Sequence, residues 1–219
     1  MKHITLIHTI ESVYHTFPQL LKKAFEPEEI EISSIVDEFL YKNIKKTGSF
    51  TMANRRKLML DILSAEAENP DVIIVTCSSL TPYVGEVMDS FKTPIVRIDS
   101  NMCKLAAEKG NKIAVIATAS TTVGPTVSFI QSFADQLGKK IEIKTVLDEN
   151  AKVELESGNV DKHDTMIAEM AATCPDCDVV VLAQASMATA LEKTEKLCPK
   201  TLVLTSPGSA IQEAKDCIK

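Results

Sequence analysis

The stretch Asp71-Val-Ile-Ile-Val-Thr-Cys-Ser-Ser79 has a counterpart 107 residues later, Asp178-Val-Val-Val-Leu-Ala-Gln-Ala-Ser186. Each begins with an aspartate, continues through a short apolar run and ends in small or hydroxyl residues. A short β-branched run bounded by polar residues is typical of a strand buried inside a parallel sheet. The two stretches therefore predict one buried strand in each half of the chain.

Other apolar runs repeat at nearly the same separation. Ile95-Val96 aligns with Leu202-Val203 at 107 residues, and Ile4-Thr-Leu-Ile-His8 aligns with Ile113-Ala-Val-Ile-Ala117 at 109. Single matches between apolar strands are common, but several in register at a nearly constant separation indicate an internal repeat. The repeat predicts two halves, each built around four strands.

Helical stretches fill most gaps between these runs, which is the pattern of βα units. We predict an α/β fold of two pseudosymmetric Rossmann-like domains with parallel four-stranded sheets, one over 1–98 plus 206–219 with a returning C-terminal helix, the other over 99–205. Helices should begin at Glu11-Ser12 and at Ser206-Pro207, with Thr121-Thr122 as a cap. The polar stretch 148–160 is predicted to be a loop or a frayed helix start. The predicted strands are 3–8, 29–35, 72–76, 94–98, 112–117, 141–147, 178–183 and 201–205.

Composition excludes several classes of function. The 219 residues are 45% hydrophobic and carry a net charge of −6, without the basic patch that nucleic acid requires. Apolar runs such as Val72–Val75 are far shorter than the roughly 20 residues that cross a bilayer. No secretory signal pattern precedes the first strand. We expect a cytoplasmic protein with no nucleic-acid or membrane partner.

The six cysteines are scattered through a chain long enough to fold without disulfides. Only Cys174-Pro-Asp-Cys177 has close spacing, and neither a second such pair nor a His-x-x-x-His accompanies it to complete a zinc site. The structural interpretation, a helix end leading into the strand at Asp178, is favoured over redox or metal chemistry.

Ligands of parallel α/β sheets bind beyond the carboxyl ends of the strands. Hydroxyls dominate the residues that follow the predicted strands, and cations are nearly absent there. A small carboxylate would then be held by hydroxyl and backbone N–H donors, in a cleft to which both halves contribute. The predicted substrate-binding residues are Thr9, Ser78, Ser79, Thr118, Thr121, Thr122, Gln184, Ala185 and Ser186.

Cys77 and His8 are the predicted catalytic residues. Cys77 ends a strand beside a predicted helix start, where the positive helix terminus favours a thiolate, although a buried cysteine can equally be a small core residue. His8 ends the first strand and could act as general acid or base, or could simply bond a neighbouring loop.

Three segments resemble the aspartate/glutamate/hydantoin racemase superfamily. Val72-Ile-Ile-Val-Thr-Cys-Ser-Ser79 is similar to the first cysteine motif, and Val180-Val-Leu-Ala-Gln-Ala-Ser-Met-Ala188 to the second. Ile113-Ala-Val-Ile-Ala-Thr118 is similar to the threonine-rich turn that opens the second half. The resemblance implies two α/β halves around a cofactor-independent active site without a metal, and relatives that are often homodimers.

This sequence departs from the family pattern at the second cysteine, where it has Gln184. The family's two thiols work on opposite faces of the substrate α-carbon, and an amide cannot replace a thiol in proton transfer. Three possibilities stay open: proton chemistry by Cys77 with a different partner such as His8, a single-cysteine decarboxylase or cis–trans isomerase of a small dicarboxylate, and carboxylate binding without turnover.

Overall fold

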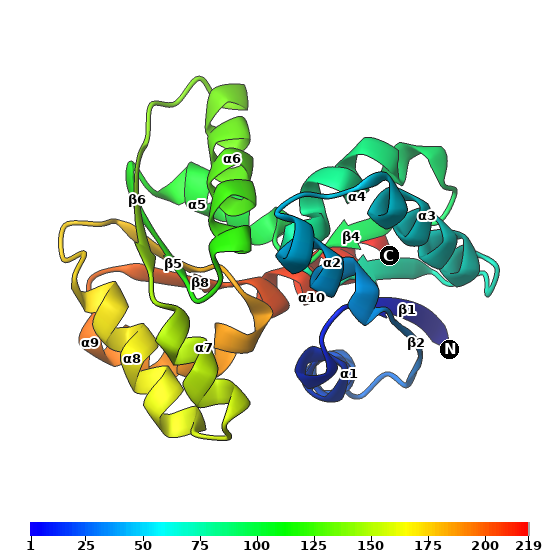
Figure 1. Ribbon diagram of the computed structural model, residues 1–219, viewed down its shortest axis with the longest axis horizontal. Coiled ribbons are helices and arrows are strands. Elements are labelled where there is room, and N and C mark those ends of the chain that lie inside the picture. Colours follow the sequence, from blue (N-terminus) through cyan, green and yellow to red (C-terminus); the bar gives the residue numbers. More distant parts are fainter. Residues whose placement is uncertain (219) are drawn as a thin grey trace. The chain divides into compact units, whose positions relative to one another are not determined.

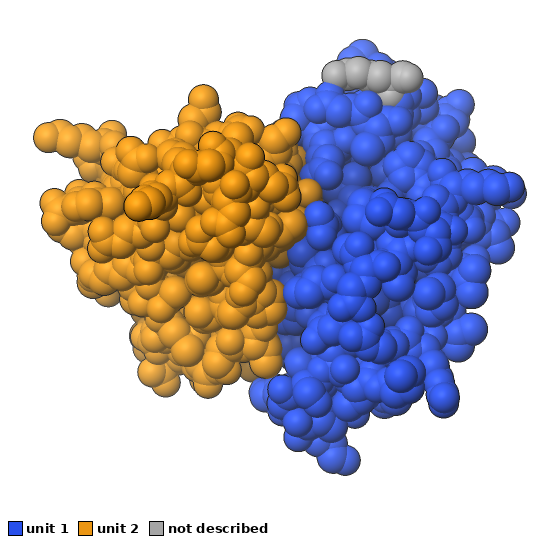
Figure 2. All heavy atoms as spheres, turned by 90° about the horizontal axis from the view of Figure 1, so that it is seen from above, with its two compact units in different colours: residues 1–98, 210–219 blue, residues 99–209 orange. Residues whose placement is uncertain are grey.

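The computed structural model describes residues 1–218 and divides into two compact units (Figures 1 and 2). Unit 1 contains Met1–Ile98 together with the end of the chain from Ala210, and unit 2 is Asp99–Ser209. Each unit has one four-stranded sheet, ordered β2-β1-β3-β4 in unit 1 and β6-β5-β7-β8 in unit 2. All pairings between neighbouring strands are parallel, so the predicted fold class is confirmed.

In unit 1, all of β3 and residues 4–8 of β1 are buried because helices cover both faces of the sheet (Figure 1). One face packs on α2, α3 and α4, through residues such as Leu40, Leu58 and Val84. Apolar residues of α1 are buried as well, and α10 joins this unit through a bond from Lys215 Nζ to the Ala24 carbonyl. The elements are β1 (Lys2–His8), α1 (Glu11–Phe25), β2 (Ile30–Val36), α2 (Glu38–Thr47), α3 (Met52–Glu66), β3 (Val72–Val75), η1 (Ser78–Leu80), α4 (Thr81–Val87), η2 (Met88–Ser90), β4 (Ile95–Arg97) and, from Ala210 onward, α10 (Ser206–Cys217).

Unit 2 repeats this plan with helices on both faces of its sheet (Figure 1). Met102 and Ile130, from α5 and α6, pack on one face, and Ala151 and Ile167, from α7 and α8, on the other. The elements are α5 (Ser100–Lys109), β5 (Lys112–Ala117), α6 (Ser120–Gln136), β6 (Glu142–Leu147), α7 (Glu149–Glu156), α8 (Val160–Ala172), β7 (Val179–Leu182), η3 (Ala185–Ala190), α9 (Leu191–Leu197) and β8 (Leu202–Thr205).

The predicted repeat extends to individual hydrogen bonds. Asp37 N–H donates to the His8 carbonyl at 2.9 Å, and Asp148 N–H donates to the Ala117 carbonyl at 3.1 Å. Both aspartates also cap the helix that follows, because each side chain accepts a bond from the backbone N–H two residues later. The two units therefore share strand ends, turns and caps.

Two local predictions were wrong. Helix α6 begins at Ser120 with Ala119 as its N-cap, so Thr121 and Thr122 lie inside the first turn and make no cap. The stretch 148–160, predicted to be a loop or a frayed helix start, contains the whole of α7 and the start of α8. Asp148 supplies the cap for α7, and the buried Ala151 is its main contact with the core, so the stretch shows little apolar periodicity.

Gly110 permits a close approach between α5 and the sheet of unit 2. A Cβ atom there would lie 2.7 Å from Ile113 Cγ1 and 2.9 Å from Val179 Cγ2. Because such overpacking forces the core to move, Gly110→Ala should lower the free energy of unfolding by about 1–3 kcal/mol in urea titrations followed by circular dichroism. In Gly208→Ala, the control, no atom lies within 4 Å of the new Cβ, and stability should hold or rise. Equal unfolding midpoints for wild type and Gly110→Ala would show that the core accommodates the added methyl group without loss of stability.

Candidate functional site

The candidate site in unit 1 lies where β1 and β3 end side by side. Ile7 pairs with Val75 in the last register of the two strands, and the ladder continues for one more bond, from Thr76 N–H to the Ile7 carbonyl at 3.0 Å. His8 and Cys77 follow directly. The apolar pairing of two central strands thus brings both predicted catalytic residues to one sheet edge.

Cys77 is 7% exposed and lies at the start of η1. Its carbonyl accepts a bond from Leu80 N–H at 3.0 Å, which closes the turn that leads into α4. The side chain belongs to the core cluster that contains Ile7 and Leu80. Ser78 and Ser79 are buried to the same extent. Three polarisable or hydroxyl side chains therefore lie together in a sheltered turn at the end of a buried strand.

His8 is fully buried, and its side chain hydrogen-bonds to that of Thr76. Its Nδ1 lies 2.9 Å from Thr76 Oγ1, and that hydroxyl donates to the Ile7 carbonyl at 3.1 Å. A hydroxyl that donates its only proton to a carbonyl must accept the bond from the ring. Nδ1 therefore carries the ring proton and Nε2 has the lone pair. Among residues 1–218, Nε2 has no hydrogen-bond partner.

Burial lowers the pKa of His8 to about 4 because water no longer stabilises the imidazolium. The edge of the Tyr14 ring faces the imidazole at a centroid distance of 5.8 Å. His8 is therefore neutral near pH 7, which limits any proton-transfer role there to accepting a proton at Nε2.

In unit 2, Gln184 occupies the position equivalent to Cys77. Ala183 N–H donates to the Ile116 carbonyl at 3.0 Å, as Thr76 N–H does to Ile7, and Met187 N–H donates to the Gln184 carbonyl at 2.9 Å. Both residues have extended backbone with φ −128° and precede a 3-10 helix. The turns at Cys77 and Gln184 thus have the same backbone hydrogen bonds, but one carries a thiol and the other an amide.

Thr118 holds the Gln184 side chain in one orientation. Thr118 N–H donates to Gln184 Oε1 at 2.6 Å, and the Thr118 hydroxyl lies 3.2 Å from the same atom. A backbone N–H can only donate, so the amide oxygen faces Thr118 and the NH₂ group points away. The half-buried amide therefore presents hydrogen-bond donors.

The remaining predicted binding residues lie at the same sheet edges of their own units. Thr9 follows β1 and is buried, and Thr122 is buried in the first turn of α6. Thr121 is half-buried, and its Oγ1 has no partner among the residues that the structure describes. Ala185 and Ser186 are half-buried at the start of η3. In both units, hydroxyl side chains and the first turns of helices therefore lie at the carboxyl edge of the sheet.

Sequence reasoning missed a charged cluster after β2. Lys57 Nζ lies 2.9 Å from Asp37 Oδ2 and 3.8 Å from Asp61 Oδ1, and both aspartates are buried. Burial and the adjacent Asp37 carboxylate raise the pKa of Asp61 to about 7. The available signals were the aspartate directly after a strand and the i,i+4 spacing of Lys57 and Asp61.

Arg97 is a second charged residue that the sequence analysis did not single out. It ends β4 in register with Val75, beside the strand that leads to Cys77. A Cβ on Gly85 would lie 2.5 Å from Arg97 Nη1, so the glycine leaves space for the guanidinium against α4. The carboxyl edge of this sheet therefore holds one arginine.

The two sheet edges carry a limited set of functional side chains. Within residues 1–218, no group of three or more His, Cys, Asp or Glu side chains is arranged to hold a metal ion. No helix in that range is long and apolar enough to cross a membrane. The functional groups at the two sheet edges include a thiol, a neutral imidazole, hydroxyls, an amide and the Arg97 guanidinium.

Solved structures with this fold include three racemases. The aspartate racemase of Picrophilus torridus has a TM-score of 0.75 and 14% identity, with 99% of this chain and 94% of that chain covered. A glutamate racemase of Bacillus anthracis has a TM-score of 0.72 and 12% identity, covering 98% and 80%. The allantoin racemase of Klebsiella pneumoniae has a TM-score of 0.70 and 12% identity, covering 100% and 88%.

Sequence comparison gives the family directly. A comparison with curated proteins finds no match. The sequence family described as Asp/Glu/Hydantoin racemase matches residues 4–214, nearly the full chain, in agreement with the predicted resemblance. The chain is therefore a member of the Asp/Glu/hydantoin racemase family.

Proposed function

We propose that this protein is a cofactor-independent racemase- or isomerase-like enzyme that acts at the carbon next to the carboxylate of a small amino acid or related acid. The family and the fold support a racemase-type enzyme. The observation that carries the finer proposal is the equivalence of Cys77 and Gln184 in two turns with the same hydrogen bonds. One reactive thiol and one amide donor imply proton chemistry on one face of the substrate carbon.

In the proposed reaction the Cys77 thiolate removes the proton from the substrate α-carbon. The electron pair left behind delocalises into the carboxylate, whose oxygens gain charge. Hydrogen-bond donors already in place stabilise that charge more than flexible ones would. Ser78, Ser79 and the Gln184 NH₂ group are the proposed donors. The proton then returns to the same face from Cys77, whose thiol exchanges with water in the meantime.

His8 is the second candidate for moving a proton. The structure makes it neutral with the lone pair on Nε2, so it can accept a proton and hold it only briefly, because its pKa of about 4 is low. Protonated His8 is therefore rare near pH 7, and we propose that delivery of a proton by this second group is the slow step. We expect exchange of the α-proton with solvent to outrun inversion.

The test is incubation of the protein in D₂O with amino acids, hydantoins, malonates and maleate. NMR scores deuterium at the α-carbon, loss of CO₂ and cis–trans conversion, and chiral chromatography scores inversion. Exchange that is faster than inversion supports the proposal. Decarboxylation or cis–trans conversion would instead assign a single-cysteine decarboxylase or isomerase. Tight binding of a carboxylate with none of these reactions would make the protein a binding protein and overturn the proposal.

Gln184→Cys should restore a second thiol at the equivalent position. General acid–base catalysis contributes about 10²- to 10⁴-fold, so inversion should rise by a factor in that range relative to exchange. Gln184→Ser is the matched control, because it removes the same amide and supplies no thiol. If the folded Gln184→Cys variant gains no inversion over this control, residue 184 does not face the reacting carbon.

A further inference from the structure

The Cys174-Pro-Asp-Cys177 motif forms a turn between α8 and β7. Cys177 N–H donates to the Cys174 carbonyl at 3.2 Å, which closes four residues into a hydrogen-bonded turn. Such a turn brings its first and last Cα atoms within about 7 Å. Disulfides need a Cα–Cα separation of about 4.4–6.8 Å. The backbone therefore holds the two cysteines at a separation suitable for a bond.

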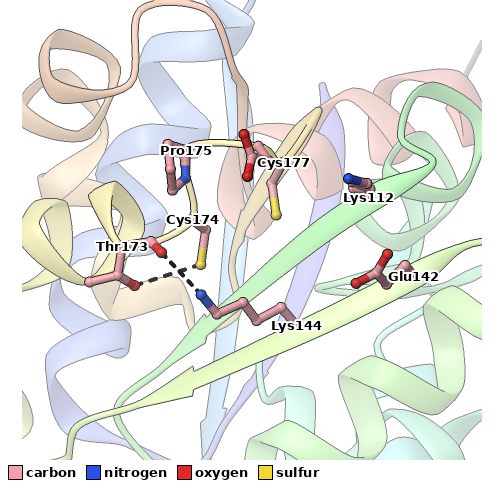
Figure 3. Close-up of a pocket in the computed structure, with 8 residues that line it drawn as sticks. Lys112, Glu142, Lys144, Thr173, Cys174, Pro175 and Cys177 are labelled. Carbon is pink, nitrogen blue, oxygen red and sulfur yellow. Dashed lines mark hydrogen bonds between the residues drawn. The ribbon is translucent and has the colours of Figure 1, made fainter.

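The two thiols differ in their access to solvent. Cys174 is 4% exposed and packs in the core cluster with Ile116 and Val180, whereas Cys177 is half-buried. Both side chains line a pocket of about 190 Å³ beside the turn that precedes β7. Figure 3 shows the residues that line it. An incoming reagent can therefore reach Cys177 more readily than Cys174.

Neighbouring groups act on these thiols in opposite directions. Burial, assisted by the Cys174 thiol, raises the pKa of Cys177, and the Lys144 ammonium acts to lower it. Lys144 Nζ is fixed beside the turn by a 3.0 Å bond to the Thr173 carbonyl, and the Thr173 hydroxyl lies 3.7 Å from Cys174 Sγ (Figure 3). The Cys174 thiol is thus an immediate neighbour of Cys177, and a cation lies beside the pair.

We propose that Cys174 and Cys177 are a reversible dithiol–disulfide site that reacts with low-molecular-weight disulfides. Cys177 thiolate attacks the disulfide, forms a mixed disulfide and releases one thiol. Cys174 then attacks the Cys177 sulfur, forms the Cys174–Cys177 bond and releases the second thiol. The protein loses two electrons and two protons, and the small disulfide gains both and becomes two thiols. Excess small thiol reverses both steps.

This site is separate from the proposed racemase-like function. The pocket is lined by Lys112, Glu142 and Lys144, at the amino ends of β5 and β6, and by the turn that precedes β7. Thr118 and Gln184 follow the carboxyl ends of β5 and β7, at the opposite edge of the same sheet. Failure of one proposal therefore leaves the other untouched.

The test uses the full chain in buffers with a graded ratio of reduced to oxidised glutathione. After alkylation with iodoacetamide under denaturing conditions, the reduced protein should carry six labels, one for each cysteine. The oxidised protein should carry four and be 2 Da lighter before labelling. Trypsin cleaves after Lys162 and Lys193, so the bond should lie within a single peptide, His163–Lys193. Dithiothreitol should return all six labels.

Two variants test the order of the steps. Cys174→Ala should accumulate the glutathione adduct on Cys177, because the resolving thiol is gone. Cys177→Ala should accumulate at least tenfold less adduct on Cys174, because that sulfur is buried. Cys217→Ser, which changes an exposed thiol in unit 1, is the control and should oxidise as wild type does.

Three results would overturn the proposal. The first is six labels at every glutathione ratio in the folded protein. The second is a bond from Cys174 to Cys198, which packs in the same cluster and would link two different tryptic peptides. The third is equal adduct formation on the two single variants, which would show that the turn does not order the thiols.

Discussion

Cys77→Ser is expected to reduce exchange of the substrate α-proton by about 10²- to 10⁴-fold. A hydroxyl is a far weaker acid than a thiol, so serine cannot supply a thiolate-like base at neutral pH. Cys77 is 7% exposed, and serine has the same shape with a slightly smaller terminal atom, so the fold should be retained. The measurement is loss of the α-proton signal in D₂O, with the substrate that the panel identifies.

The control for this variant is Cys217→Ser, which removes an exposed thiol from the same unit. Its exchange rate should match that of wild type. Exchange within a factor of about three of wild type in folded Cys77→Ser would place the reacting base elsewhere. His8, the neutral imidazole at the same sheet edge, would then be the group to replace next.

Asp61→Asn is expected to make the stability of unit 1 rise by about 3 kcal/mol between pH 4 and pH 6.5. This rise comes from His8, whose pKa of about 4 in the native state lies below its usual value near 6.5. Between these pH values the unfolded state binds a proton that the native state does not. The contribution of His8 is therefore complete above pH 6.5 and is lost as pH falls toward 4.

The wild-type protein should lack this rise because Asp61 opposes it. Its pKa is raised to about 7, so the native carboxyl keeps a proton that the unfolded state releases above about pH 4. That contribution is present at low pH and is lost as pH rises toward 7. Between about pH 4 and pH 6.5, unfolding lets His8 bind one proton and makes Asp61 release one. The two effects on the free energy of unfolding therefore cancel.

His8→Gln should consequently show the reverse slope, with stability falling as pH rises from 4 to 7. Urea titrations at pH 4.5, 5.5 and 6.5 measure these slopes. The chain has no tryptophan, and its three tyrosines, Tyr14, Tyr41 and Tyr83, all lie in unit 1, so tyrosine fluorescence reports on that unit alone. Parallel pH profiles for wild type and both variants would contradict the assigned protonation states.

The fold could be predicted from the sequence because its central strands are short, continuous apolar runs that repeat along the chain. Strand residues 112–117 were predicted without error, since every residue after Lys112 is apolar and buried. Helix α7 was missed because a helix with one fully buried alanine leaves almost no periodic signal. Periodicity reports burial, and it is weak where a helix lies mostly on the surface.

For the candidate site, the sequence could indicate which residues lie at the strand ends, but not the protonation of His8 or the orientation of Gln184. The predicted strand ended at residue 35, whereas Val36 still pairs with His8, so Asp37 was not recognised as a strand-end residue. The neutral state of His8 depends on complete burial and on the Thr76 hydroxyl, 68 positions away. The orientation of Gln184 depends on one backbone N–H, 66 positions away. Contacts between distant residues of this kind leave no local pattern.

The return of the chain end to unit 1 affects the order in which the protein can fold during synthesis. Domains generally complete in order from the N-terminus as the ribosome extends the chain. Here unit 1 receives its last segment, from Ala210 onward, only after all of unit 2 has been made. Until then unit 1 lacks the helical segment that bonds to Ala24 of α1, whereas the whole sequence of unit 2 has already been synthesised. During synthesis, unit 2 is therefore completed before unit 1, although most of unit 1 precedes it in the sequence.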